Sequence, residues 1–362
     1  MKKDVIIFIE IGQYGYDYSI INVINNLKDY YQIEYLGLYE QKPIVSNKDL
    51  KVNHIKIKCG KLTRKIEFTL RVWKILRQKN NVGVINLGYY LFCSPLVFLL
   101  GRNKTLVQFK TGFIEKNNFI RLIKNYILRK ESVLFPNITT LSKDLKEYLK
   151  LPNHSQIFEL GANVPKISLE GKLSERLNML YIGTFFERNI NVFIEGLKYH
   201  CQKFPSEEIN FTIIGYGNEL EESQIANSIK FVPKNLRVSI LGRKQPNELP
   251  SFYLSNSIGI SYVPLKPQFL FQPVTKTIEY LLNGMLVIGT KLKGNEQLIH
   301  QQNGVLIEEE PESISNGIIQ VRSLLEKKIE RKIIAKEVKK YTWKNLIDTQ
   351  YRPLLQKIIS NE

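Results

Sequence analysis

The sequence predicts an α/β protein with two parallel-sheet domains, and three observations support this prediction. Its 362 residues are enough for two domains of ordinary size. Hydrophobic residues make up 43% of the chain and aromatic residues 11%, which allows two large cores and excludes a disordered basic chain. Short β-branched runs alternate with amphipathic stretches along both halves, which is typical of β-α-β units around a parallel sheet.

The first half contains the first series of elements. Each expected strand is a short apolar run, and the expected helices have apolar residues three or four positions apart. The expected strands are 5–9, 32–39, 54–58, 82–87, 105–109 and 138–141. The expected helices are 19–27 and the strongly basic 65–78.

The alternation restarts after a polar stretch at 166–176, which we expect to be a linker. The expected strands are 178–182, 211–214, 237–241, 257–262, 285–289 and 305–307, and the clearest helices are 191–201 and 276–282. Domains are therefore expected at 1–165 and 177–340, followed by a helical segment at 341–362. Three strands of the second half end in glycine before a helix, a geometry that can cradle phosphate. Two such Rossmann-like halves would place a cleft between the carboxyl ends of their sheets.

The positive charge is concentrated in one part of the chain. The formal net charge is +18, and residues 51–150 hold 21 basic and 5 acidic side chains. This concentration indicates an anionic partner on one side of the molecule: a membrane surface, a nucleic acid or a phosphorylated substrate.

Several classes are disfavoured by what the sequence lacks. Cys59, Cys93 and Cys201 lie far apart, so neither a disulfide framework nor a CxxC metal site is expected. The histidines and aspartates show no metal-ligand spacing, so we expect no metal site. The apolar run at 89–100 contains Pro95 and is too short to span a bilayer, and the N-terminus lacks a cleavage site, so a soluble or peripheral protein is expected.

An ordered set of segments resembles a known family. The segments are 140–149, 159–164, 180–190, 211–217, 241–243, 248–259 and 272–289. Together they resemble glycosyltransferase family 4 (group 1 glycosyltransferases), and the segment with Pro273, Lys276 and Glu279 is the most diagnostic. A single strand followed by GxG is a weak signal by itself, and the order of the segments carries the resemblance. Residues 1–110 match only in architecture.

The resemblance implies the GT-B fold, in which two Rossmann-like domains face each other across a cleft and a C-terminal helix at 341–362 crosses back to the first domain. It implies that 1–165 binds the acceptor and that 177–340 binds the nucleotide sugar. It implies a nucleotide-diphosphate sugar as the donor substrate, no cofactor, and transfer with retention of configuration. Arg188 and Lys276 would stabilise the leaving phosphate, and Glu279 would accept hydrogen bonds from the ribose. The other donor-binding residues expected are Gly12, Gly15, Gly183, Gly215, Gly217, Arg243, Pro273 and Thr275.

Some positions depart from the family pattern or have a second interpretation. Phe271 stands where many members carry the first of two glutamates, and Lys110 stands where a histidine usually contacts the sugar, so Lys110 is a tentative catalytic residue. Glu279 could also be an ordinary helix residue paired with Lys276, and the loop with Gly12 and Gly15 could be a flexible turn. A catalytically silent subunit of a transferase complex is therefore an alternative.

Two basic amphipathic helices are expected at 64–79 and 116–130, where aliphatic residues are interleaved with Lys and Arg. Such helices suit an anionic membrane surface, although each could also be a packing helix with a basic outer side. Together with these helices, the resemblance implies a cytoplasmic enzyme, peripheral on the inner face of the membrane, that extends a polyprenyl-diphosphate-linked saccharide in bacterial surface polysaccharide synthesis. A nucleic-acid-binding protein is less favoured because no such module is present. A nicotinamide-dependent oxidoreductase is disfavoured because the loop after the first strand lacks GxGxxG.

Overall fold

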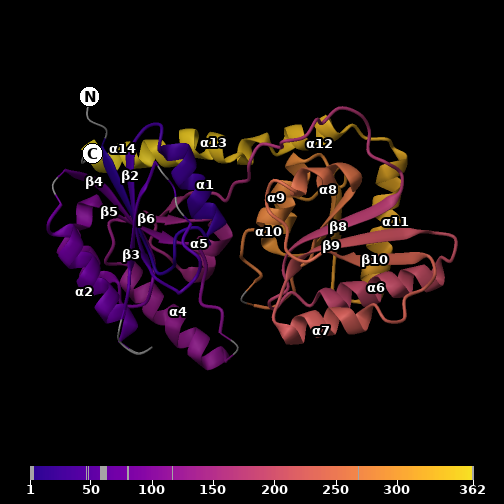
Figure 1. Cartoon of the computed structure of the whole chain (residues 1–362), viewed down its shortest axis with the longest axis horizontal. Coiled ribbons are helices and arrows are strands. Elements are labelled where there is room, and N and C mark those ends of the chain that lie inside the picture. The colour runs from indigo at the N-terminus through magenta and orange to yellow at the C-terminus, as the bar shows by residue number, and fades with distance from the viewer. Residues whose placement is uncertain are drawn as a thin grey trace. The chain divides into compact units, whose positions relative to one another are not determined.

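A computed structural model gives the architecture of the chain (Figure 1) and describes residues 4–45, 47, 49–57, 63–79, 81–115, 117–267 and 269–360. The chain forms two compact units, each described separately below. Unit 1 comprises Met1–Gly161 and Trp343–Glu362, and unit 2 comprises Ala162–Thr342. Ala162 pairs with Thr342 in a parallel bridge, so the chain enters and leaves unit 2 side by side.

Unit 1 is built on a seven-stranded parallel sheet with the order β3-β2-β1-β4-β5-β6-β7. The strands are β1 (Val5–Glu10), β2 (Gln32–Leu38), β3 (Lys51–Ile55), β4 (Val82–Gly88), β5 (Thr105–Phe109), β6 (Asn137–Thr140) and β7 (Gln156–Ile157). The order reverses between β1 and β4, and in open parallel sheets ligand sites usually lie at the carboxyl ends of the strands at such a point.

The helices of unit 1 come from both ends of the chain. They are α1 (Tyr18–Leu27), α2 (Arg64–Leu76), α3 (Ser94–Leu100), α4 (Asn118–Ser132), α5 (Lys143–Leu149), α13 (Trp343–Leu346) and α14 (Arg352–Ser360), with a π-helical turn at Ile347–Tyr351. One core on the sheet joins α1 with α13, the π turn and α14, and Phe158 stacks on Tyr351 at 4.3 Å within it. The C-terminal segment is therefore an integral part of unit 1.

Unit 2 contains a six-stranded parallel sheet with the order β10-β9-β8-β11-β12-β13. The strands are β8 (Leu177–Thr184), β9 (Ile209–Tyr216), β10 (Leu236–Ile240), β11 (Ile258–Ser261), β12 (Leu286–Thr290) and β13 (Gly304–Ile307). The helices are α6 (Ile190–Lys203), α7 (Glu219–Ser228), α8 (Leu249–Ser255), α9 (Thr275–Leu282), α10 (Lys293–Glu296), α11 (Pro311–Glu326) and α12 (Arg331–Glu337). Helices α6, α7 and α11 lie on one side of the sheet, with α8, α9 and α12 on the other (Figure 1).

The structure confirms the α/β fold with two parallel sheets and changes several predicted boundaries. The segment 166–176, expected as a linker, belongs to unit 2, because Leu173 is buried there and its N–H donates to the Ile329 carbonyl at 3.1 Å. The strand expected at 54–58 is β3, which begins at Lys51, and Lys58 lies outside the described residues, as does Cys59. Lys116, the expected start of the second basic helix, is also outside them, and α4 begins at Asn118.

No helix in the described part of the chain is long and apolar enough to cross a membrane.

Candidate functional site

A cavity of about 240 Å³ opens in unit 2 at the carboxyl ends of β8 and β11, where it meets the N-terminus of α9. Its lining includes five of the residues singled out from the sequence: Gly183, Arg188, Pro273, Thr275 and Lys276. The carboxyl edge of a parallel sheet beside a helix N-terminus is the usual position of a ligand site in this class of fold.

The end of β8 is held in place by two tyrosines. Tyr280 of α9 accepts a hydrogen bond from the Ile182 N–H at 2.8 Å, and the Tyr181 hydroxyl donates to the Thr184 carbonyl at 2.9 Å. Both side chains are buried, and burial raises the pKa of each hydroxyl well above its usual range, so both stay protonated. The backbone around Gly183 therefore has a fixed position against α9.

Helix α9 presents an uncapped N-terminus to this cavity. Its N-cap, Val274, has no side-chain hydrogen-bond acceptor, and its first turn contains no acidic residue. The first backbone N–H groups of a helix lack partners within the helix and carry partial positive charge. Thr275 and Lys276, which begin the helix, add a hydroxyl and an ammonium group. This end of α9 is therefore suited to an anionic ligand.

Lys276 and Glu279 form an ion pair along one face of α9, and Glu279 is buried. The Tyr253 hydroxyl lies 3.4 Å from the same Glu279 oxygen, on the side of α8. The predicted pairing of these two residues is thus present. This ion pair holds the Lys276 ammonium group near the cavity. Glu279 lies one helical turn further along α9 and does not line the cavity.

Arg188 supplies a second cation. Its guanidinium lies 4.8 Å from the centre of the Phe269 ring, and both residues line the cavity. Burial lowers the pKa of Arg188, and nearby Tyr181 and Glu187 oppose this effect. Because an arginine pKa starts far above neutrality, the group stays charged. The backbone conformation of the loop is unusual, since Glu187 and Asn189 have positive φ angles of 51° and 50°.

A buried polar network supports the floor of the site. The Thr277 hydroxyl lies 2.7 Å from Ser261 Oγ and 2.5 Å from Asn295 Oδ1, and the Asn295 amide donates to the Thr290 carbonyl at 2.7 Å. These bonds connect α9, the end of β11, α10 and the end of β12. Fully paired buried networks of this kind fix backbone positions. Ser261 also lines the cavity; sequence reasoning missed it, because no local motif marks it.

The residues predicted around the second glycine motif lie outside this cavity. Gly215 pairs with Gly183 in the register of β8 and β9, and the Gly217 N–H donates to Glu222 at 3.1 Å. Arg243 lies over the exposed ring of Tyr216, with 5.2 Å between guanidinium and ring centre. The structure therefore does not bring Gly215, Gly217 and Arg243 together with Lys276.

The helix that follows this motif differs from α9 at its N-terminus. Asn218 and Glu221 form a capping box at the start of α7, with both hydrogen bonds 3.0 Å long. Glu219 and Glu222 also lie in its first turn. Four side chains thus already serve the N-terminal N–H groups or repel an anion, so α7 offers no phosphate site comparable to that of α9.

Three predicted residues belong to unit 1. Gly12 and Gly15 follow β1, and Gly15 has φ +100° with Val45 packed against it. The Lys110 ammonium group, directly after β5, lies 3.1 Å from Glu10 Oε1 and 3.0 Å from Asp17 Oδ2. Burial raises the pKa of Glu10 against the opposing effect of Lys110, whereas the two carboxylates raise the pKa of Lys110 despite its burial. Lys110 is therefore an ion-paired lysine.

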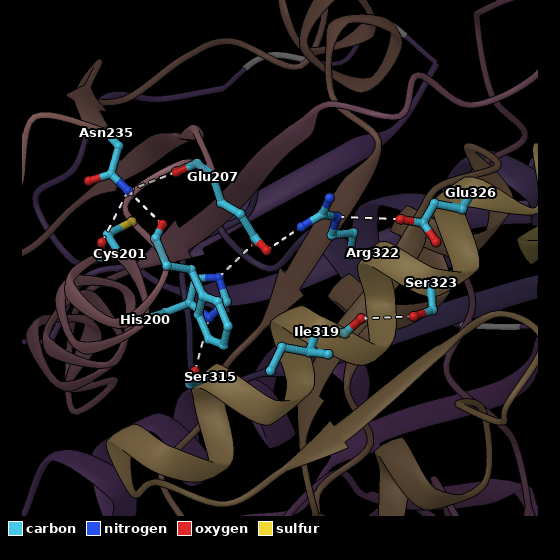
Figure 2. Close-up of polar contacts among 10 residues, drawn as sticks. His200, Cys201, Glu207, Asn235, Ser315, Ile319, Arg322, Ser323 and Glu326 are labelled. Atoms are coloured by element: carbon cyan, nitrogen blue, oxygen red, sulfur yellow. Dashed lines mark hydrogen bonds and ion pairs between the residues drawn. The ribbon is translucent and has the colours of Figure 1, made fainter.

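A serine, a histidine and a glutamate of unit 2 lie in the order of a hydrolase triad (Figure 2). His200 Nδ1 is 2.9 Å from Ser315 Oγ, and His200 Nε2 is 3.0 Å from Glu207 Oε2. The exposed fractions of His200 and Ser315 are 0% and 2%, so a substrate has no access to the hydroxyl. Glu207 also pairs with Arg322 of α11. We interpret the group as a clamp between α6 and α11.

Within the described ranges, no group of three or more His, Cys, Asp and Glu side chains is arranged to hold a metal ion.

Comparisons with known proteins agree with the fold described above. Residues 176–323 match the family model of the glycosyl transferases group 1. The sucrose-phosphate synthase of Thermosynechococcus elongatus is similar over 99% of this chain and 100% of its own, with a TM-score of 0.72 and 14% identity. A glycosyltransferase from Rickettsia africae is similar over the full length of both chains, with a TM-score of 0.70 and 15% identity.

A third structure, Anabaena HepE in complex with UDP, is similar over 98% of this chain and 100% of its own, with a TM-score of 0.71 and 11% identity. At such identities the structures show the fold alone. A comparison with the sequences of curated proteins gives no match. The fold of the chain is that of the GT-B glycosyltransferases. The resemblance to group 1 glycosyltransferases is confirmed, and the family model lies over the unit that holds the cavity.

Proposed function

We propose that the protein transfers a sugar from a nucleotide-diphosphate donor, bound in the unit 2 cavity, to a saccharide acceptor. The observation that carries the proposal is the convergence of Arg188, Lys276 and the uncapped N-terminus of α9 on one cavity. These groups match a diphosphate in charge and in hydrogen-bond donors. The UDP bound to the similar Anabaena protein is consistent with such a donor.

The proposed reaction breaks the bond between the anomeric carbon and the phosphate oxygen and forms a bond from that carbon to an acceptor hydroxyl. Negative charge develops on the leaving phosphate, where Arg188, Lys276 and the α9 N–H groups stabilise it in a partly buried site. The acceptor proton passes to the leaving phosphate. Retention of configuration and independence of a metal ion belong to the proposal and rest on the family resemblance.

The side chain of Lys276 gives the sharpest test of the donor site. Lys293 is a matched control, because it also begins a helix and pairs with a glutamate three residues later, Glu296, at 2.8 Å, yet it is not among the residues lining the cavity. Removing a charge-assisted hydrogen bond costs about 1.5–3 kcal/mol, which corresponds to about 10-fold to 100-fold in affinity. We expect Lys276→Met to weaken nucleoside diphosphate binding by this factor and Lys293→Met to leave it unchanged.

Isothermal titration of the full chain with UDP, GDP, ADP and dTDP measures this difference. Failure of all four to bind the wild type would contradict the proposed donor site. Binding without hydrolysis or transfer of the matching nucleotide sugar, across a panel of lipid-linked acceptors, would instead favour the catalytically silent subunit, in line with Phe271 at the position of the missing glutamate.

The lipid-linked acceptor and the peripheral membrane location are proposed from α4. Phe119, Leu122 and Tyr126 lie on its outer face, with exposed fractions of 70%, 65% and 56%. Arg121 and Glu131 are buried on its inner face at 8% and 7%. The helix thus has its apolar side outward, which is unfavourable in water and favourable at a membrane.

Two other helices of unit 1 also expose apolar side chains. Ile66 and Leu70 of α2 and Phe98 and Leu99 of α3 are exposed as well. Cations lie over several of the aromatic rings, including Arg102 over Phe98 at 5.0 Å, and Arg77 over Trp73 and Lys130 over Tyr126 at 5.6 and 5.5 Å. Apolar side chains bordered by Lys and Arg suit the cytoplasmic leaflet, which carries anionic lipids. We therefore propose that the enzyme acts at the inner face of the membrane in surface polysaccharide synthesis.

A further inference from the structure

A basic groove lies at one edge of the unit 1 sheet, between β3 and α2, and the proposed function does not use it. Its volume is about 860 Å³, and it is called the β3 groove here. Among the described residues its lining contains five cations and no carboxylate. The cations are Lys51, Lys56, Arg71, Lys74 and Lys79. A lining of one charge sign favours an occupant of the opposite sign.

Two neighbouring carboxylates neutralise only part of this charge. Glu34 of β2 lies 4.0 Å from Lys51 and also pairs with Lys79. Glu67 of α2 pairs with Arg71 at 2.6 Å. Five cations and two carboxylates leave a net charge of +3 at the groove.

The positions of the cations indicate more than protection of a sheet edge. Lysines on an edge strand often serve only to discourage pairing with other chains. Here Arg71 and Lys74 belong to α2 and Lys79 follows it, so most of the charge lies on the helix side of the groove. His54 adds no charge near neutral pH, because burial lowers its pKa and its Nε2 accepts a hydrogen bond from the Tyr14 N–H at 3.3 Å.

The edge of β3 offers backbone groups for pairing. β3 is the outer strand of the sheet, and its ladder within the described ranges is with β2 alone. The Ile55 carbonyl accepts from the Tyr39 N–H at 3.0 Å, so every second residue counted back from Ile55 directs its backbone N–H and C=O toward β2. The backbone groups of Val52 and His54 therefore point away from the sheet, and both residues line the groove.

We propose that the β3 groove binds an extended acidic segment of a partner protein, which adds a strand beside β3. Its backbone pairs with Val52 and His54, as in other complexes formed by strand addition. Every second side chain of the added strand points to the side of Arg71, Lys74 and Lys79, so the segment carries acidic residues at alternate positions. A nucleic acid or an anionic lipid would match the charge without matching the alternating donors and acceptors of the strand.

Fluorescence anisotropy with the full chain tests the proposal. The probe is a labelled heptapeptide of alternating glutamate and threonine. One control peptide has the same side chains with alternate backbone nitrogens methylated, which removes N–H donors and keeps the charge, and a second has lysine in place of glutamate. We expect the probe to bind, the methylated peptide to lose about 10-fold or more in affinity, and the lysine peptide not to bind.

A matched pair of variants tests the charge. Lys74 is exposed on α2, and Lys357 is exposed on α14 and does not line the groove. Both substitutions change the net charge of unit 1 equally. We expect Lys74→Glu to weaken binding of the probe about fivefold and Lys357→Glu to leave it unchanged.

Amide hydrogen exchange measured by NMR locates the bound peptide. The N–H groups of Val52 and His54 should exchange more slowly in the complex, whereas that of Asn53, which is directed toward β2, should not change. The proposal is overturned if the probe does not bind, if the methylated peptide binds as tightly, or if the two variants bind the probe equally. It is also overturned if Lys74→Glu weakens binding of duplex DNA or of phosphatidylglycerol vesicles and leaves binding of the probe intact.

Discussion

Gly215 of β9 lies beside Gly183 of β8, and the absence of a side chain at this position serves packing. A Cβ atom at Gly215 would lie 1.9 Å from the Gly183 carbonyl oxygen and 2.8 Å from the Phe185 ring. The strand backbone is fixed by the parallel ladder, so it cannot move aside cheaply. Gly215 belongs to a segment that resembles a family motif, and its lack of a side chain is required for packing at the strand edge that carries the candidate site.

This packing predicts different effects on stability for substitutions at two glycines that were both predicted to bind the donor. Gly215→Ala should lower the free energy of unfolding by about 1–3 kcal/mol or more, the usual cost of overpacking. Gly12→Ala should be close to neutral, because a Cβ atom there would meet nothing within 4 Å and its φ is not positive. Urea unfolding followed by circular dichroism compares the two. Equal stability of both variants would contradict the packing role of Gly215.

Lys110 shows why some residue roles could not be predicted. Its partners Glu10 and Asp17 are 100 and 93 positions away in the chain, at the ends of other elements. Sequence spacing carries no information on contacts of that range, so the sequence suggested only a tentative catalytic residue at this position and gave no sign of the ion pairs. The Lys276 and Glu279 pair is three residues apart on one helix, and it was predictable for that reason.

At the scale of elements, helix capping distinguishes the N-terminus of α9, the proposed phosphate site, from the N-terminus of α7. β8 ends in glycine before α6 and β9 ends in glycine before α7, yet α7 is capped by its own Asn218 and Glu221, whereas α6 and α9 lack a side-chain cap. The sequence signal was present, because Asn218 followed three residues later by Glu221 is the signature of a capping box. If the capping-box signal had been considered together with the glycine motif, α7 would have been excluded as a phosphate site.

Helix α4 has its apolar side outward, which differs from the packing helix with a basic outer side that was one of the two interpretations of 116–130. Its apolar spacing predicted a basic amphipathic helix, and by the usual rule the apolar side would face the core. The structure instead buries Glu131, which accepts hydrogen bonds from the Tyr89 hydroxyl and from the Phe92 and Ser94 N–H groups at 2.8–3.1 Å. These partners lie about 40 positions earlier in the chain, so local periodicity could not reveal them.

The outward apolar face leads to a prediction for membrane binding. Leu122→Glu should reduce co-sedimentation with vesicles containing anionic phosphatidylglycerol, because it places a carboxylate where an apolar group would enter the interface. Leu220→Glu on α7 is the matched control, since Leu122 and Leu220 have exposed fractions of 65% and 67%. We expect at least a fivefold loss for the first variant and no change for the second. Equal binding by both variants would exclude α4 as the contact surface.

At the scale of the whole molecule, the net charge divides unevenly between the units. Unit 1 holds 29 basic and 15 acidic residues, a net of +14, whereas unit 2 has a net of +4. The proposed donor site therefore relies on a few cations, such as Arg188 and Lys276, in a unit whose charges nearly balance. The excess lies in the unit that carries α4, which fits long-range attraction to an anionic surface better than donor recognition.

Most strands and the two-domain architecture were predictable, because a parallel sheet buried on both sides requires continuous apolar runs. The strand 105–109 has the predicted bounds, and 82–87 differs by one residue. The observed start of unit 2 differs from the predicted one because Leu173 packs into the core of unit 2. No local sequence pattern reveals this contact. Short helices such as α5 and α8 were not predicted, since seven residues give too few turns for a clear period.

The C-terminal segment provides the last prediction. Seven of its side chains are buried in the unit 1 core: Trp343, Leu346, Ile347, Tyr351, Leu354, Leu355 and Ile358. Burial of a large apolar side chain contributes about 1.5–3 kcal/mol, so their loss removes on the order of 10 kcal/mol, as much as the whole stability of a typical domain.

A chain ending at Thr342 should therefore lose the cooperative unfolding of unit 1 and keep that of unit 2, whose core is contained in 162–342. Differential scanning calorimetry should show the unit 1 transition missing, and a chain that lacks only residues 361–362 should behave like the wild type. A truncated chain that retains both transitions would show that unit 1 folds without the returning helices.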